Sequence, residues 1–184
     1  MEAALRLHTS ELREAVPGLR AGDRVLLSGT IHTARDAAHK RIFALLDAGG
    51  EPPFPLRGAV IYYAGPTPGQ QGMAVGACGP TTSSRMDCFA PRLLDLGLAA
   101  MIGKGQRSAE VAEAIVRNGA AYFAAVGGAG ALIARCIETA EVVAFEDLGC
   151  ESVKRMTVRD FPLTVAIDSR GDNLYETGRA EYAR

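Results

Sequence analysis

The chain has 184 residues, of which 48% are hydrophobic and 22% are charged, a composition typical of a folded globular protein rather than a disordered one. This length predicts a single domain, which we assign to residues 1–184. The formal net charge is −1, so the chain lacks the basic excess that nucleic-acid binding requires, and we expect no nucleic-acid partner.

The sequence also predicts that the protein has no membrane partner. Its longest apolar runs, such as residues 120–126, are far shorter than the roughly 20 residues that a membrane-spanning helix needs. The N-terminus, MEAALRLHTSEL, lacks the basic region and the long apolar region of a secretory signal. We therefore expect a cytoplasmic protein.

The four cysteines, at positions 78, 88, 136 and 150, form no CxxC pair. Zinc and iron–sulfur sites usually contain closely spaced ligand pairs, so we expect no metal ligands in this chain. Nothing in the sequence points to the oxidising compartment that disulfides need. The simplest interpretation is that the cysteines pack in the interior, most strongly for Cys136, and no chemical role is assigned to Cys78 or Cys88.

The hydrophobic pattern alternates between strand and helix along most of the chain. Alternating or continuous short apolar runs predict strands, and apolar residues at spacings of three and four predict helices. The predicted strands cover residues 3–8, 24–31, 58–63, 73–77, 98–102, 121–126 and 142–145. The predicted helices cover residues 11–16, 34–48, 87–96, 108–117 and 131–139.

This alternation in the middle of the chain is typical of a parallel sheet joined by crossover helices. The segments 153–158 and 163–168 mix apolar and polar residues and end in a turn at residues 170–173, which favours antiparallel strands. The predicted fold is therefore α/β, with a parallel core joined to an antiparallel layer.

The first of four polar segments, SGTIHTARDAAHKR at residues 28–41, passes from the end of a strand into the start of a helix. Arg35 and His39 are four residues apart and share one helix face. The start of a helix attracts anions, and an arginine beside it adds a bidentate clamp for a carboxylate. The alternative is a solvated basic helix start, which is the default interpretation for Lys40 and Arg41.

The second segment, CGPTTSSRMD at residues 78–87, contains five consecutive hydroxylic or basic residues, from Thr81 to Arg85. Hydroxyl groups and backbone N–H groups beside an arginine suit a carboxylate or a phosphate. The alternative is a capping sequence for the following helix, with a serine or Asp87 as the cap, and we expect Asp87 to cap that helix in either case. We favour binding because capping alone does not require this run of residues.

Two further segments follow predicted strands. In MIGKGQ, Lys104 stands between two glycines, so it is either a ligand at the end of the sheet or an ordinary loop lysine. In VGGAGA, residues 126–131, the glycines resemble a dinucleotide fingerprint, but Ile133 occupies the third glycine position, so we interpret this turn as close packing with an anion role for its N–H groups. Glu146 and Asp147 follow a predicted strand and could act as a base or form a structural pair, and we favour an ion pair near a turn.

The order SGTIHTARDAAHKR, GPTTSSRMD, MIGKG, VGGAGAL and FEDLG resembles the β subunit, or C-terminal domain, of the iron–sulfur-dependent hydro-lyases. These are the class I fumarases and the L(+)-tartrate dehydratases, and the resemblance covers nearly the whole chain. It implies a swivelling three-layer β/β/α domain, with a central parallel sheet, helices on one face and an antiparallel sheet on the other. Ser84 and Cys88 depart from the residues common at those positions of the family.

The resemblance also implies an activity and a partner. The activity is reversible dehydration of a C4 2-hydroxydicarboxylate, either malate to fumarate or L-tartrate to oxaloacetate, and the sequence does not choose between them. A partner α subunit would hold the 4Fe-4S cluster, this chain alone would be inactive, and the assembly would be a heterotetramer or a dimer.

Motif matching assigns roles to individual residues. Arg35, Arg85 and Lys104 correspond to substrate-carboxylate ligands, and Thr81 corresponds to the catalytic threonine proposed for substrate contact or proton transfer. The supporting candidates are His39, Thr82 and Asp36.

Two other functions compete with this one. A swivelling carrier would be phosphorylated on His32 or His39, and it would need that histidine to be exposed. A stand-alone carboxylate-binding enzyme would work without a metal and without a partner.

Overall fold

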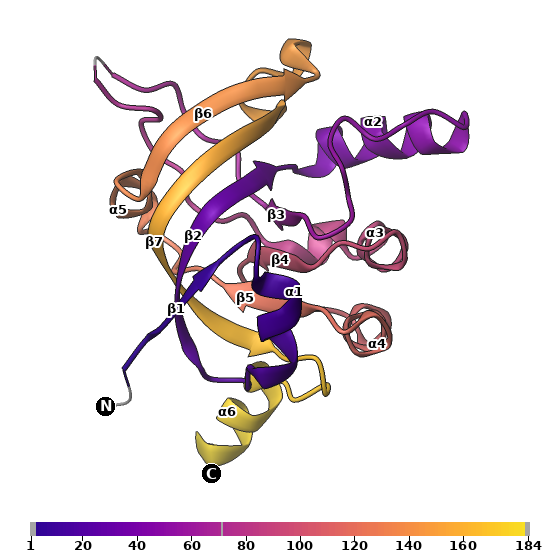
Figure 1. The fold of residues 1–184 in the computed structure, drawn as a ribbon, viewed down its shortest axis with the longest axis vertical. Helices are drawn as coiled ribbons and strands as arrows, with labels where there is room; N and C mark the ends of the chain where they lie inside the picture. The colour runs from indigo at the N-terminus through magenta and orange to yellow at the C-terminus, as the bar shows by residue number, and fades with distance from the viewer. Residues whose placement is uncertain (1–2, 71, 183–184) are drawn as a thin grey trace.

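The computed structural model describes residues 3–70 and 72–182 (Figure 1). The strands of this part of the chain form one sheet in the order β1-β2-β3-β4-β5-β7-β6. They are β1 (Leu5–His8), β2 (Arg24–Thr33), β3 (Val60–Tyr62), β4 (Ala100–Gly103), β5 (Ala121–Ala124), β6 (Ile137–Ala144) and β7 (Val153–Ile167). The α-helices are α1 (Leu12–Ala15), α2 (Asp36–Asp47), α3 (Ala90–Asp95), α4 (Ala109–Asn118), α5 (Gly130–Ala134) and α6 (Leu174–Tyr182). Short 3₁₀ helices are η1 (Val16–Gly18), η2 (Ser83–Met86) and η3 (Glu146–Glu151).

The sheet combines parallel and antiparallel strands, which confirms the mixed α/β class. Strands β1 to β5 run parallel to one another, and β7 runs antiparallel to β2, β5 and β6. Because β7 pairs with both β2 and β5, the pairings β2-β3-β4-β5-β7 close into a ring. Figure 1 shows the long curved strands β2, β7 and β6 beside the short strands β3 to β5, with α2, α3 and α4 next to the short strands.

The core consists of two apolar clusters, one on each face of the sheet. Neighbouring strand residues point to opposite faces, so Tyr62 and Phe123 join one cluster while Ile61, Met101 and Tyr122 join the other. All five side chains are fully buried. Burying one large apolar side chain contributes roughly 1.5–3 kcal/mol, so this part of the sheet gives the residues at its edge a rigid support.

The two antiparallel strands predicted at residues 153–158 and 163–168 are one continuous strand, β7. Its register with β2 shifts at a bulge beside Gly29, which has a φ of +111°, and Asp160 of β7 has a φ of +49°. The bulge accommodates the polar residues between the two predicted strands, so the pairing with β2 continues past them. Those polar residues are the reason that a break was expected there.

Two predicted elements are wrong. The helix expected over residues 131–139 stops early, because β6 already begins at Ile137 and pairs there with β7. The strand expected over residues 73–77 does not form, and Val75 makes only an isolated bridge to Pro68. In the first case the pairing with β7, the next strand along the chain, outweighs the local helical spacing.

The helices differ from expectation at two further places. The helix predicted over residues 87–96 begins only at Ala90, with Pro91 in its first turn, where no backbone N–H partner is needed. Helix α6 follows the turn at residues 170–173 and was not expected. In the described part of the chain, no helix has the length and apolar character needed to cross a membrane.

Candidate functional site

The predicted polar segments meet at one edge of the sheet. Strands β2, β3, β4 and β5 are parallel, so the residues that follow them lie at the same edge. The 78–87 segment follows a loop rather than a strand, but the Thr81 N–H donates to the Tyr63 carbonyl at 2.7 Å, directly after β3. This bond brings the segment back to the edge.

An ion pair joins the first polar segment to the second. The Arg85 guanidinium binds Asp36 through both carboxylate oxygens, with Nε 2.9 Å from Oδ1 and Nη2 2.8 Å from Oδ2. Its Nη1 lies 3.5 Å from the hydroxyl of Thr81. Asp36 begins α2, where the positive end of the helix dipole favours a carboxylate. Thr81, Arg85 and Asp36 therefore form one group, with the arginine side chain half exposed.

Arg35 precedes α2 and is held by a residue that sequence reasoning missed, Glu151. The Arg35 Nη2 lies 3.5 Å from Glu151 Oε1, and the other Glu151 oxygen accepts a hydrogen bond from the Ala37 N–H at 3.1 Å. Glu151 thus replaces the side-chain cap that α2 otherwise lacks. Gly65 leaves room for the arginine, because a Cβ there would lie 3.0 Å from Arg35 Nη1.

Lys104 follows β4 directly and is tied to the second segment through its backbone. It forms an isolated bridge with Thr82, its N–H donates to the Ser83 hydroxyl at 3.0 Å, and its carbonyl accepts from the Ser83 N–H at 2.9 Å. Its side chain runs past Gly127, where a Cβ would lie 3.4 Å from Lys104 Cδ. Among the residues that the structure describes, no carboxylate lies within ion-pair distance of the Lys104 ammonium.

The charges at this edge are unequally compensated. Asp36 pairs with Arg85, and Glu151 pairs with Arg35. Of these three cations, Lys104 is therefore the one without a carboxylate partner in the described part of the chain. An anionic ligand at this edge meets one free ammonium and two arginines whose carboxylate partners it must share.

Comparisons with known proteins show the family of this chain. A family model described as Fumarase C-terminus matches residues 1–178. The chain belongs to the fumarase C-terminal family. It is 35% identical over 93% of its length to "Fumarate hydratase 2" of Leishmania major, and 37% identical over 83% of its length to "Fumarate hydratase class I, anaerobic" of Escherichia coli K12.

The relatives differ in how much of their length the chain covers. It spans 30% of the Leishmania fumarate hydratase and 28% of the Escherichia coli enzyme, less than a third of either. It spans 87% of a Methanocaldococcus jannaschii protein that bears the provisional name L(+)-tartrate dehydratase subunit beta, with 37% identity over 89% of this chain. The family thus includes both longer enzymes and separate subunits of this chain's size.

His39 lies beneath the site rather than at its surface in this family member. It is fully buried, its Nδ1 lies 2.8 Å from the Arg35 carbonyl, and its ring packs against Tyr63 and Phe89. A carbonyl only accepts, so Nδ1 carries the proton, and His39 holds the backbone of Arg35. His32 is also buried and stacks on Phe54 at 4.0 Å. Neither histidine presents the exposed ring that a phosphocarrier needs.

The state of His39 makes a pH prediction. Burial lowers its pKa from 6.5 to about 4, although the hydrogen bond to Arg35 opposes this shift. Below pH 6.5 the unfolded chain takes up a proton that the folded chain does not. The free energy of unfolding should therefore fall between pH 6.5 and 4, by at most about 1.4 kcal/mol per pH unit for this one residue, and the fall should level off below pH 4.

Nuclear magnetic resonance of the ring nitrogens tests this prediction directly. At pH 5 we expect the neutral His39 ring with the proton on Nδ1. Burial, with a smaller contribution from Arg155, lowers the pKa of His32 to about 4 as well, so its ring should behave like that of His39. A His39 ring that titrates near its ordinary pKa would refute the assigned role.

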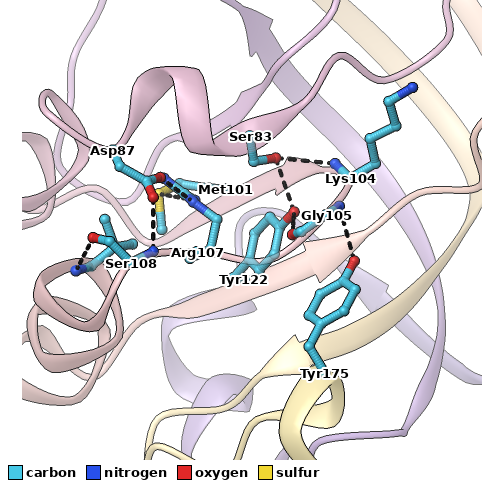
Figure 2. Close-up of polar contacts among 10 residues, drawn as sticks. Ser83, Asp87, Met101, Lys104, Gly105, Arg107, Ser108, Tyr122 and Tyr175 are labelled. Atoms are coloured by element: carbon cyan, nitrogen blue, oxygen red, sulfur yellow. Dashed lines mark hydrogen bonds and ion pairs between the residues drawn. The ribbon is translucent and has the colours of Figure 1, made fainter. Parts of the chain in front are cut away.

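A buried ion pair between Asp87 and Arg107, which was not predicted from the sequence, lies beside the site. Asp87 accepts hydrogen bonds from Arg107 Nε at 2.6 Å and from the Ser108 N–H at 2.7 Å (Figure 2). The expected cap of the helix after Asp87 is therefore wrong, because α3 starts later and Asp87 instead binds the N-cap residue of α4. The Arg107 side chain is completely buried and stacks over the rings of Tyr63 and Tyr122.

The cysteines of this chain do not fit an iron–sulfur cluster. Within the described residues, no three metal-ligating side chains gather. Cys78 is buried, and burial raises the pKa of its thiol to about 12, which disfavours the thiolate that iron requires. Cys88 and Cys150 are exposed, and all four cysteines are free.

The glycine-rich turn at residues 126–131 packs closely against its neighbours. Gly127 borders the Lys104 side chain, and Gly130 lies against Gly79, with only 3.1 Å between the Gly79 nitrogen and a Cβ placed on Gly130. The α5 helix that follows has only five residues. These contacts favour the close-packing interpretation of the turn.

Proposed function

We propose that this chain is the β subunit of an iron–sulfur-dependent hydro-lyase that reversibly dehydrates a C4 2-hydroxydicarboxylate, either malate to fumarate or L-tartrate to oxaloacetate. We include in the proposal that residues 1–184 form one domain with the swivelling three-layer β/β/α arrangement. The observation that carries it is the convergence of three cationic segments at one edge of the sheet, in a chain that spans 87% of a subunit-sized relative.

In this proposal, Arg35, Arg85 and Lys104 bind the two substrate carboxylates. The arginines offer flat bidentate donors and the lysine offers a single mobile charge, which suits two carboxylates at different angles. Removal of the proton from C3 places negative charge on the neighbouring carboxylate, and fixed cations stabilise that charge. A bound carboxylate shares Arg85 with Asp36, which keeps the guanidinium aimed at the edge.

Thr81 is the candidate for substrate contact or proton transfer. Its hydroxyl lies 3.5 Å from Arg85 Nη1, so a cation stands beside the oxygen that would take or give the proton. A neighbouring cation stabilises the alkoxide form of a hydroxyl and makes it a stronger acid. Thr82 and His39 support the site, the first beside Lys104 and the second beneath Arg35.

The proposal needs a partner, because the cysteines of this chain do not gather. An α subunit would carry the 4Fe-4S cluster and supply its Lewis-acid chemistry, in a heterotetramer or a dimer of unlike subunits. The metal-free, partner-free alternative predicts instead that this chain is active alone.

Anaerobic co-expression with the α subunit tests the proposal. Assays with malate, fumarate and both tartrate enantiomers should show activity for the purified pair on one substrate class and none for this chain alone. Turnover of fumarate by the isolated chain at the rate of the pair would overturn it, and so would an inactive pair whose cluster is intact by its visible absorption.

A further inference from the structure

The backbone of Lys104 and Gly105 is bound at every polar group. Ser83 binds the Lys104 N–H and carbonyl, as described above, at 3.0 and 2.9 Å. The Gly105 N–H donates to the Tyr175 hydroxyl at 3.0 Å, and the Gly105 carbonyl lies 2.9 Å from the Tyr122 hydroxyl. Figure 2 shows these contacts gathered at the root of the Lys104 side chain, which extends away from them.

The hydroxyl protons can be assigned from this geometry. The Tyr122 hydroxyl lies 2.9 Å from both Ser83 Oγ and the Gly105 carbonyl oxygen. A carbonyl cannot donate, so the Tyr122 proton goes to Gly105 and the Ser83 proton goes to the Tyr122 oxygen. Burial raises the pKa of Tyr122, which keeps its proton in place. Each donor and acceptor of this chain of hydrogen bonds is then used once.

The two glycines beside Lys104 follow from the same contacts. A Cβ on Gly103 would lie 1.9 Å from the Ser83 hydroxyl oxygen, so only glycine allows Ser83 to approach. Gly105 has a φ of +86°, a backbone conformation that side chains disfavour. The contacts around the Lys104 backbone thus explain why a glycine stands on each side of this lysine.

We propose that Ser83, Tyr122 and Tyr175 are positioning residues, which fix the backbone of Lys104 and thereby direct its ammonium at the substrate carboxylate. This proposal rests on the proposed function, because it assigns Lys104 a carboxylate to bind. A lysine side chain is long and flexible, so the position of its root decides where the charge can reach. A displacement of about 1 Å at a reacting centre can cost a factor of about 10² in rate.

The test uses the co-expressed enzyme with Ser83→Ala, Tyr122→Phe and Lys104→Met. We expect Ser83→Ala and Tyr122→Phe each to lower kcat/KM by about 10- to 100-fold in the unmodified enzyme. In the Lys104→Met enzyme, each should lower kcat/KM by less than about threefold relative to Lys104→Met alone. Tyr62→Phe is the matched control, because the Tyr62 hydroxyl is equally buried and donates to the Cys78 carbonyl instead. Tyr62→Phe should leave kcat/KM unchanged.

A second readout needs only this chain. Hydrogen exchange at the Lys104 N–H should become about tenfold faster in Ser83→Ala and stay unchanged in Tyr62→Phe. Unchanged exchange in Ser83→Ala, or full additivity with Lys104→Met, would overturn the positioning role alone. If Lys104→Met itself leaves kcat/KM unchanged, the carboxylate role of Lys104 fails, and the inference that depends on it fails too.

Discussion

Replacing Lys104 with methionine is expected to lower kcat/KM of the co-expressed enzyme by about 10²- to 10³-fold, which corresponds to about 3–4 kcal/mol of lost transition-state stabilisation. Arg35 and Arg85 already share their charge with Glu151 and Asp36, whereas no carboxylate of the described residues pairs with Lys104. Its ammonium is therefore the charge most available to a substrate. Methionine keeps the unbranched apolar stem beside Gly127, so folding should be preserved.

Steady-state kinetics with the preferred substrate measures this effect. The matched control is Lys40→Met, the same substitution at an exposed position of α2. Both variants should unfold at the denaturant concentration of the unmodified protein. If Lys104→Met stays within threefold of the control, the ammonium does not bind substrate and the charge balance at the sheet edge has another purpose.

The parallel core was predictable because its signals are local. The helical spacing of residues 34–48 and 108–117 corresponds to α2 and α4, and the apolar run at residues 98–102 corresponds to β4. Helices α2 and α4 each bury one face, and β4 is buried on both faces. By contrast, the start of β6 was mistaken for a helix, because among the described strands β6 pairs with β7 alone, and no pattern within residues 137–139 indicates that pairing.

The site follows the same division. Lys104 could be singled out because it directly follows β4, and Arg35 because it lies between the end of β2 and the start of α2. Thr81 and Arg85 could be singled out because they stand in an unusual polar run. Glu151 is 114 residues from Ala37, whose N–H it binds, so no spacing rule connects them. Close to Glu151 in the sequence, Glu146 and Asp147 were predicted to form an ion pair. Asp147 does bind Arg41 at 3.0 Å, on the exposed surface.

Buried polar partners are the hardest to predict. Tyr122 occupies an apolar strand and its type alone suggests core packing, which is also true of its ring. Only the fold shows that its hydroxyl meets Ser83 and Gly105. The signal that was available is indirect: a tyrosine in a fully buried strand needs a partner for its hydroxyl, and a lysine between two glycines needs a reason for both.

The largest effect on stability is expected from Asp87→Asn. The Arg107 side chain is completely buried, and Asp87 is its carboxylate partner at 2.6 Å. Asparagine keeps an oxygen for the Ser108 N–H, so the substitution removes the charge while keeping the shape. The substitution leaves the buried Arg107 guanidinium without a compensating charge. We therefore expect the free energy of unfolding to fall by about 3–5 kcal/mol.

Urea denaturation compares this variant with Asp147→Asn, which removes the same charge from an ion pair whose side chains are 48% and 64% exposed. Solvent screens such a pair, so its loss should cost about 0–1 kcal/mol. Equal losses in the two variants would mean that water reaches Arg107 and that the pair is not buried in solution. A large loss for Asp87→Asn alone would show that a buried ion pair stabilises the segment that contains Arg85. This ion pair includes none of Arg35, Arg85 and Lys104. Different residues would then supply the rigidity and the charge of the site.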